Sequence, residues 1–195
     1  MSITSRLRRC WRIRVGAAFL AVLIAACGSS LDWRDFRSED GRFSIAFPGR
    51  VTNEKRTLTT PSGSVIMHMD SASVGDALFA VGYADYPADY LARVKPETIV
   101  NNVRDALIQN IGGRSVIESP LIQNSGGRTP SNLSGRILHA EGRSSDGKGG
   151  HHMLTLDAQL LFAGGRFYQV VVIGETGHIG KDALELYFSS FRIIE

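Results

Sequence analysis

The sequence predicts an α+β domain, in which an antiparallel β-sheet is flanked by about two main helices. Most segments after residue 40 are short, carry alternating apolar residues and are separated by turns that contain glycine or proline. Two well-separated segments instead place apolar residues at the three- and four-residue spacing of an amphipathic helix. Because each helix has one apolar stripe, we expect the helices to cover one or both faces of the sheet.

The first clear strand follows a turn signal at Asp40-Gly41, with Phe43, Ile45 and Phe47 alternating onto one face. Gly164-Gly165 predicts a tight hairpin turn between two later strands. Further strands are expected at 57–60, 65–73, 77–86, 115–122, 132–141, 153–162, 166–173 and 191–194.

The clearest helix is expected at 95–111, because Pro96 suits a first helical turn and Gly112-Gly113 predicts the end. A shorter helix is expected at about 179–189. The apolar stripe of the longer helix consists of Ile99, Val103, Ala106, Leu107 and Ile111.

The N-terminal segment has the pattern of a secretory signal. Residues 1–14 contain five arginines and no acid, residues 15–26 are apolar and uncharged, and Cys27 follows two alanines. The apolar run is shorter than the roughly 20 residues that span a bilayer. An uncleaved membrane anchor is the alternative, because Trp11 and Ile13 extend the apolar run.

The stretch Leu23-Ile24-Ala25-Ala26-Cys27 resembles the lipobox of bacterial lipoproteins. The resemblance implies that residues 1–26 are a cleaved signal peptide and that Cys27 is lipidated, with palmitate or a similar acyl chain. Residues 27–37 would then be the lipidated cysteine and a short tether. It also implies a cell-envelope location, on the outer membrane facing the periplasm in a Gram-negative cell, because Gly28 is not aspartate. The alternative is a chance cysteine after an ordinary signal peptide.

Two further stretches, SEDGRFSIAFPGR (38–50) and ALELYFSSFRII (183–194), resemble the PsbP-like family. That resemblance implies that 38–195 is a single α+β domain, a PsbP-like sandwich of an antiparallel sheet and helices. It implies no catalytic set, since the family has none in common. Four phenylalanines in these stretches are expected to be core anchors: Phe43, Phe47, Phe188 and Phe191.

Charge and cysteine content exclude several classes of protein. Five of the 22 basic residues and none of the 19 acidic residues lie in 1–26, so the remainder has a net charge of −2. A basic nucleic-acid-binding domain is therefore not indicated. The only cysteines are Cys10 and Cys27, which excludes a disulfide framework in the domain and a cysteine-based zinc site.

The segment YADYPADY, residues 83–90, is a candidate ligand or partner surface between a strand and the first helix. Its candidate residues are Tyr83, Tyr86, Asp89 and Tyr90. The alternative, which we favour, is a loop whose rings pack on the helix.

The histidines are the candidate metal ligands. His151 and His152 follow a glycine-rich stretch, and His139 lies on the neighbouring expected strand. If 142–150 forms a hairpin loop, His139 and one of the other two could approach. Adjacent strand residues point to opposite faces, so a solvated loop end is the favoured alternative. No cofactor is predicted.

The absence of any nominated catalytic set favours a non-enzymatic binding or assembly module, tethered to the membrane by Cys27. Its partner would be an envelope protein or a small ligand. A metal-dependent enzyme that uses His139, His151 and His152 is the alternative, and an assembly factor without a ligand is a third.

Overall fold

The computed structural model describes residues 31–60, 63–121, 134–145 and 151–194. The compact unit that follows the N-terminal segment spans Asp32–Glu195. Its first strand, β1 (Arg34–Ser38), begins before the expected domain boundary at residue 38. The predicted signal peptide and Cys27 lie outside the described residues.

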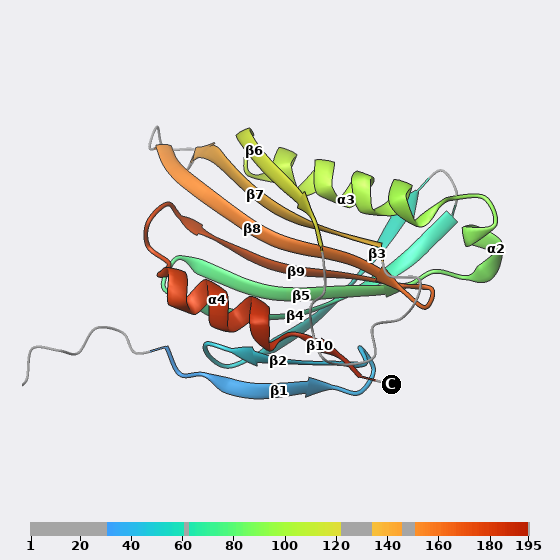
Figure 1. Ribbon diagram of the computed structural model, residues 1–195, viewed down its shortest axis with the longest axis horizontal. Coiled ribbons are helices and arrows are strands. Elements are labelled where there is room, and N and C mark those ends of the chain that lie inside the picture. The colour runs from blue at the N-terminus through green and yellow to red at the C-terminus, as the bar shows by residue number, and fades with distance from the viewer. Residues whose placement is uncertain (1–30, 61–62, 122–133, 146–150, 195) are drawn as a thin grey trace, which may run out of the picture. The chain divides into compact units, whose positions relative to one another are not determined.

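A seven-stranded antiparallel sheet forms the centre of the unit (Figure 1). Every neighbouring pair of its strands is antiparallel. Its strands lie in the order β3 (Thr52–Thr60), β4 (Gly63–Val74), β5 (Ala77–Asp85), β9 (Arg166–Glu175), β8 (His151–Ala163), β7 (Ser134–Ser145) and β6 (Gly113–Pro120).

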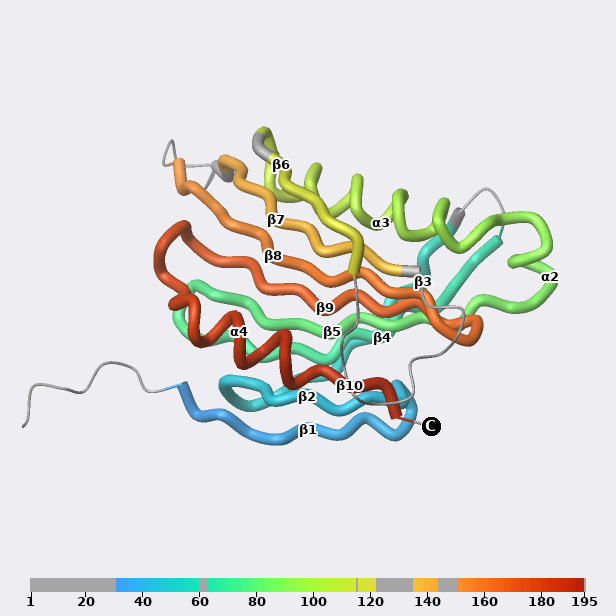
Figure 2. Tube along the Cα trace, in the orientation of Figure 1, coloured from blue at the N-terminus to red at the C-terminus, as the bar shows by residue number. Residues whose placement is uncertain are grey.

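A smaller antiparallel sheet joins the two ends of the unit. β2 (Phe43–Phe47) pairs with β1 on one side and with β10 (Arg192–Ile193) on the other. Figure 2 shows β2 lying between the first and last strands of the unit. The helices are α2 (Ala88–Leu91), α3 (Pro96–Asn110) and α4 (Lys181–Ser190), and no helix among the described residues is long and apolar enough to cross a membrane.

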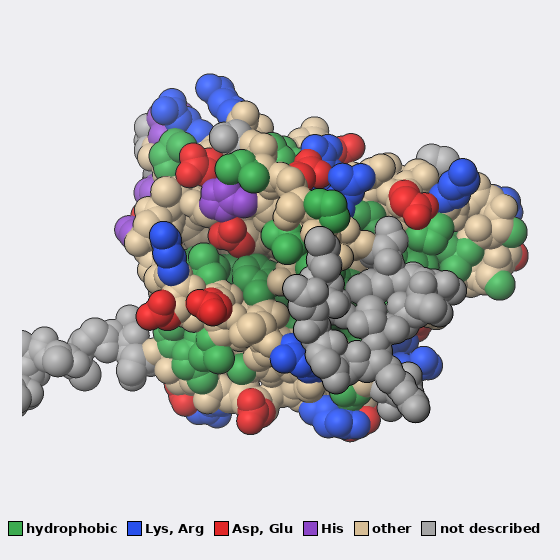
Figure 3. All heavy atoms as spheres, viewed as in Figure 1, with side chains coloured by type: hydrophobic (Ala, Val, Ile, Leu, Met, Phe, Trp, Pro, Cys, Tyr) green, Lys and Arg blue, Asp and Glu red, His purple; other side chains and the backbone are tan. Residues whose placement is uncertain are grey.

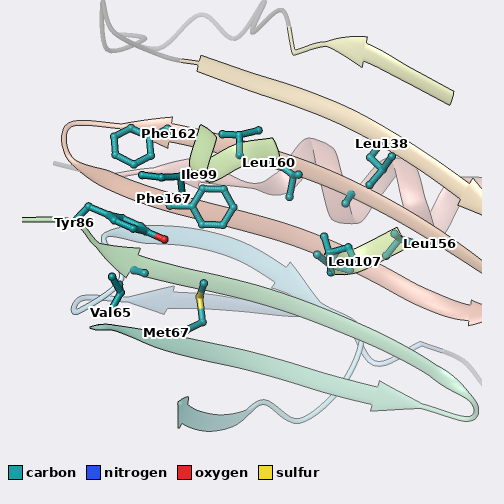
Figure 4. Packing of buried hydrophobic residues seen from close by; sticks show 14 of the residues in the cluster. Val65, Met67, Tyr86, Ile99, Leu107, Leu138, Leu156, Leu160, Phe162 and Phe167 are labelled. Carbon is teal, nitrogen blue, oxygen red and sulfur yellow. The ribbon is translucent and has the colours of Figure 1, made fainter. Parts of the chain in front are cut away.

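The two faces of the large sheet are covered by different layers. One face packs against α3, with Ile99 and Leu107 of the helix lying over Leu138, Leu156 and other strand residues (Figure 4). The other face packs against the small sheet and α4, in an aromatic cluster that includes Phe43, Phe47, Phe79, Tyr187 and Phe191. The prediction of an antiparallel α+β domain with two main helices is therefore confirmed.

Local sequence accounts for most element boundaries. Pro96 occupies the first turn of α3, and Gly112, with φ +59°, ends the helix in a conformation that disfavours side chains. Gly164 and Gly165 both have positive φ and form the tight turn between β8 and β9. Phe43, Phe47 and Phe191 are buried as expected, and Phe188 is partly buried against them.

The structure differs from the sequence-based predictions in several elements, among them strand β3, which begins at Thr52, and strand β6, which spans Gly113–Pro120. β1 was not expected, because its charged residues do not alternate with apolar ones and it forms by pairing with β2. The single turn α2 was not expected either. The strand pair β7–β8 extends through Ser145 and His151, so the expected loop at 142–150 is shorter.

Candidate functional site

The main candidate site is a groove between α3 and the β3–β4 half of the large sheet, with a volume of about 350 Å³. We call it the α3 groove. The strands contribute Arg56, Leu58, Met67, Met69 and Gln169, and the helix contributes Ile99, Asn102, Val103, Ala106, Leu107 and Asn110. Tyr86 and Tyr90 also line it.

The groove exists because α3 covers only part of its face of the sheet. The helix packs against β6, β7 and β8, whereas β3 and β4 lie beyond it (Figure 1). Alternation along β4 directs Val65, Met67 and Met69 to this face. Met67 and Met69 line the floor of the groove, and Val65 belongs to the same buried cluster as Met67. Figure 4 shows Val65 and Met67 on β4 near Tyr86.

Gln169 is a polar residue in this apolar floor. It is 7% exposed, and its side-chain nitrogen lies 3.9 Å from the sulfur of Met69, its one hydrogen bond among the described residues. Gly82 opposes it across β5 and β9, and a Cβ at Gly82 would lie only 2.7 Å from the Gln169 side chain. The glycine therefore makes room for a buried amide that forms only a weak hydrogen bond.

Tyr86 and Tyr90 pack edge to face, with ring centroids 5.2 Å apart, and Tyr86 also contacts Phe162. Both are buried. Burial raises the pKa of Tyr86 to about 12, with a smaller contribution from Tyr90, so its hydroxyl is neutral at physiological pH. Both interpretations of the YADYPADY segment apply to Tyr86 and Tyr90, because these rings pack into the core and also line the groove.

Asp89 and Tyr83, the other two candidates, do not line the α3 groove. Asp89 is exposed and forms an ion pair with Arg93 at 3.3 Å. Tyr83 belongs to β5 and faces the opposite side of the sheet, where it stacks on His68 at a centroid distance of 4.8 Å. The structure therefore brings only two of the four candidates together in the groove.

Asp85 and Arg166 form a bidentate ion pair beside Tyr83. Arg166 Nε and one terminal nitrogen each lie 2.6 Å from an Asp85 oxygen, and the guanidinium also donates to the Asp40 carbonyl oxygen at 2.6 Å. This pair lowers the pKa of Asp85. These contacts join β5 and β9 to the β1–β2 turn, so the ion pair has a structural role.

The three candidate histidines do not converge. His139 pairs with Asp157, with Nδ1 and Oδ1 2.7 Å apart. His152 lies opposite Ser144, five residues along β7 from His139, which corresponds to about 17 Å. Its Nδ1 lies 2.6 Å from Glu175 Oε1. A single metal site built from His139, His151 and His152 is therefore incompatible with this arrangement.

A second concavity of about 350 Å³ lies between the β1–β2 turn and β3–β4. Asp70 lines it and is 4% exposed, and one of its carboxylate oxygens accepts a hydrogen bond from Asn53. The other oxygen is buried without a hydrogen bond among the described residues, and burial raises the pKa of this carboxyl. Both acidic and basic side chains line this concavity, so its charge does not indicate whether a ligand would be an anion or a cation.

Sequence reasoning missed most of the groove. Met67 and Met69 were visible as alternating residues of a strand, but alternation does not tell which part of a sheet face a helix leaves open. Gln169 lies among the apolar residues of β9. A polar residue in such a strand was the one feature of the sequence that could have indicated its place in the site. No protein-family model and no curated protein matches the chain.

Proposed function

We propose that the chain is a non-enzymatic binding module whose α3 groove takes a small amphipathic molecule, with an apolar body and a polar end. The observation that carries this proposal is the buried Gln169 amide in the apolar floor. Ligand pockets are mostly apolar with a few polar groups that fix orientation, and the groove volume falls within their usual range.

The lining supports this class of ligand. Met67, Met69, Ile99 and Leu107 offer an apolar surface, and the flexible methionines can adapt to chains of different shape. Arg56, Asn102 and Asn110 line the exposed side of the groove, so polar side chains are available at its mouth as well as at Gln169 in its floor. A fully polar metabolite would leave the floor without matching contacts.

We further propose that Cys27 is lipidated and tethers this module to the cell envelope, with the fold being of the PsbP-like type. The lipobox-like sequence before Cys27 supports the first point, and the order of strands and helices is compatible with the second. The Cys27→Ala variant should lose its acyl mass and move from the membrane to the soluble fraction. Unchanged membrane partition would contradict the anchor.

Binding in the groove is tested with anilinonaphthalene sulfonate, an amphipathic dye that fluoresces when it is buried. We expect the wild-type chain to bind the dye and decanoate to displace it. Ala106→Trp should weaken dye binding at least tenfold, because Ala106 is exposed on α3 and its new ring would occupy the groove.

Gln109→Trp is the matched control, because Gln109 is an exposed α3 residue outside the groove. It adds the same indole ring to the same helix and should leave dye binding unchanged. Equal binding by both variants would place the dye elsewhere and would refute the proposed site.

A further inference from the structure

Side chains of the types that ligate metal ions meet at the end of the large sheet where β9 finishes, away from the part of the α3 groove that Tyr86 and Tyr90 line. Asp76 lies in the β4–β5 turn, Glu175 is the last residue of β9, and His178 lies in the loop before α4. Figure 3 shows histidine and acidic side chains gathered on the left of the view, where Figure 1 places the end of β9.

The donor atoms are close enough to share one ion. His178 Nδ1 lies 2.8 Å from Asp76 Oδ2 and 3.6 Å from Glu175 Oε2, and one donor atom from each residue falls within 4.8 Å of the others. Ligands bound at about 2.0–2.2 Å from a divalent ion lie roughly 3.0–3.5 Å from one another. Small side-chain movements would therefore admit an ion.

The backbone holds the three residues in place. Pairing of Leu78 with Ile173 brings the β4–β5 turn beside the end of β9. The His178 amide donates to the Glu175 carbonyl at 3.1 Å, and Gly177, with φ +84°, allows this tight turn. Two segments, the β4–β5 turn and the turn that follows β9, thus bring the three side chains together.

A fourth side chain supports the set from outside. His152 Nδ1 lies 2.6 Å from Oε1 of Glu175, whereas the contact from His178 is to Oε2. Ligating carboxylates are commonly held by such outer hydrogen bonds.

We propose that Asp76, Glu175 and His178 bind one divalent transition-metal ion of the zinc class, with His152 orienting Glu175. An imidazole nitrogen among the ligands favours zinc over magnesium or calcium, which prefer oxygen ligands only. All four side chains are partly exposed, so water can complete the coordination. This site shares no residue with the α3 groove and does not depend on the proposed ligand.

The test is calorimetric titration of the full-length chain with zinc chloride near neutral pH. We expect one zinc ion per chain. His178→Ala and Asp76→Asn should each weaken binding at least tenfold, and His152→Ala should weaken it by about 10- to 100-fold, as loss of an outer-shell partner does. Magnesium chloride should give no binding.

His139→Ala is the matched control, since His139 also pairs its Nδ1 with a carboxylate on the same sheet. It should bind zinc like the wild type, and zinc should raise the melting temperature of both. The site would be overturned if the His139→Ala and His178→Ala variants bound zinc with equal affinity, or if only His151→Ala lost zinc binding. It would also be overturned if the wild type bound no zinc. In each case the residues would form an ion-pair cluster without a metal. If His178→Ala fails to fold, zinc binding by Asp76→Asn tests the site instead, because asparagine retains a hydrogen-bonding side chain.

Discussion

Arg166 is the buried charge on which the junction between the two sheets depends. Its side chain is 9% exposed, whereas that of its partner Asp85 is 69% exposed. The guanidinium lies 5.3 Å from the centre of the Tyr83 ring. Removing the charge of Asp85 would leave this buried cation without its bidentate acceptor.

We therefore predict that Asp85→Asn lowers the free energy of unfolding by about 1–3 kcal/mol at pH 7. Because Arg166 lowers the pKa of Asp85, the contribution is present above the ordinary value of 3.8 and is lost as pH falls through the lower folded-state value. Urea unfolding at several pH values should show the two proteins converging below about pH 4.

The matched control is Asp89→Asn, which breaks an ion pair whose side chains are 79% and 61% exposed. Its effect should stay within about 0.5 kcal/mol at every pH. An Asp85→Asn effect that is as small, or that persists unchanged at low pH, would show that the Arg166 pair does not hold the junction.

At the level of single residues, the sequence indicated which residues are distinctive but not which way they face. Tyr83 and Tyr86 appear in one short aromatic segment, yet Tyr83 still belongs to β5 and faces the small sheet. Tyr86 follows the strand and lines the groove. The sequence predicts a strand through residue 86, and alternation in that strand already places residues 83 and 86 on opposite faces. What alternation does not tell is which of the two faces carries the groove.

At the level of elements, prediction was accurate wherever one periodicity dominated. The apolar stripe of α3 is buried at Ile99, Leu107 and Ile111, but Ala106 is exposed at the edge of the groove. β1 escaped prediction because it is a charged edge strand, which pairs through its backbone and presents few apolar side chains. Its position depends on β2, a tertiary effect that local sequence does not contain.

The end of α3 supplies a prediction at this scale. Gly112 has φ +59°, and a Cβ there would lie 2.9 Å from the Arg143 carbonyl oxygen of β7. Gly112→Ala should therefore cost about 2–4 kcal/mol, from left-handed backbone strain together with a forced shift of β7 against the helix end. Chemical denaturation measures the loss.

Gly164→Ala serves as the control, because Gly164 has nearly the same φ, +58°, and open space around its Cβ position. It should cost only about 1–2 kcal/mol, the backbone strain alone. Equal losses in the two variants would mean that close packing of α3 on β7 contributes nothing at this position.

At the scale of the whole unit, the groove follows from a mismatch of widths. A helix is about 10 Å across, whereas strands about 4.8 Å apart make a seven-stranded sheet roughly 30 Å wide. One helix therefore leaves much of its face open, and here the open part is β3–β4. The predicted number of strands and helices implies that one helix is narrower than the sheet face it covers. Which strands α3 packs on depends on long-range packing.

The central claim is that an amphipathic molecule binds between α3 and β4. The methionines offer a direct reporter, because the described residues include just three: Met67 and Met69 in the groove, and Met153 at the start of β8, 46% exposed. With methionine methyl groups labelled with carbon-13, decanoate should shift the NMR signals of Met67 and Met69 and leave that of Met153 in place. No shift at saturating decanoate, or equal shifts of all three signals, would contradict the claim.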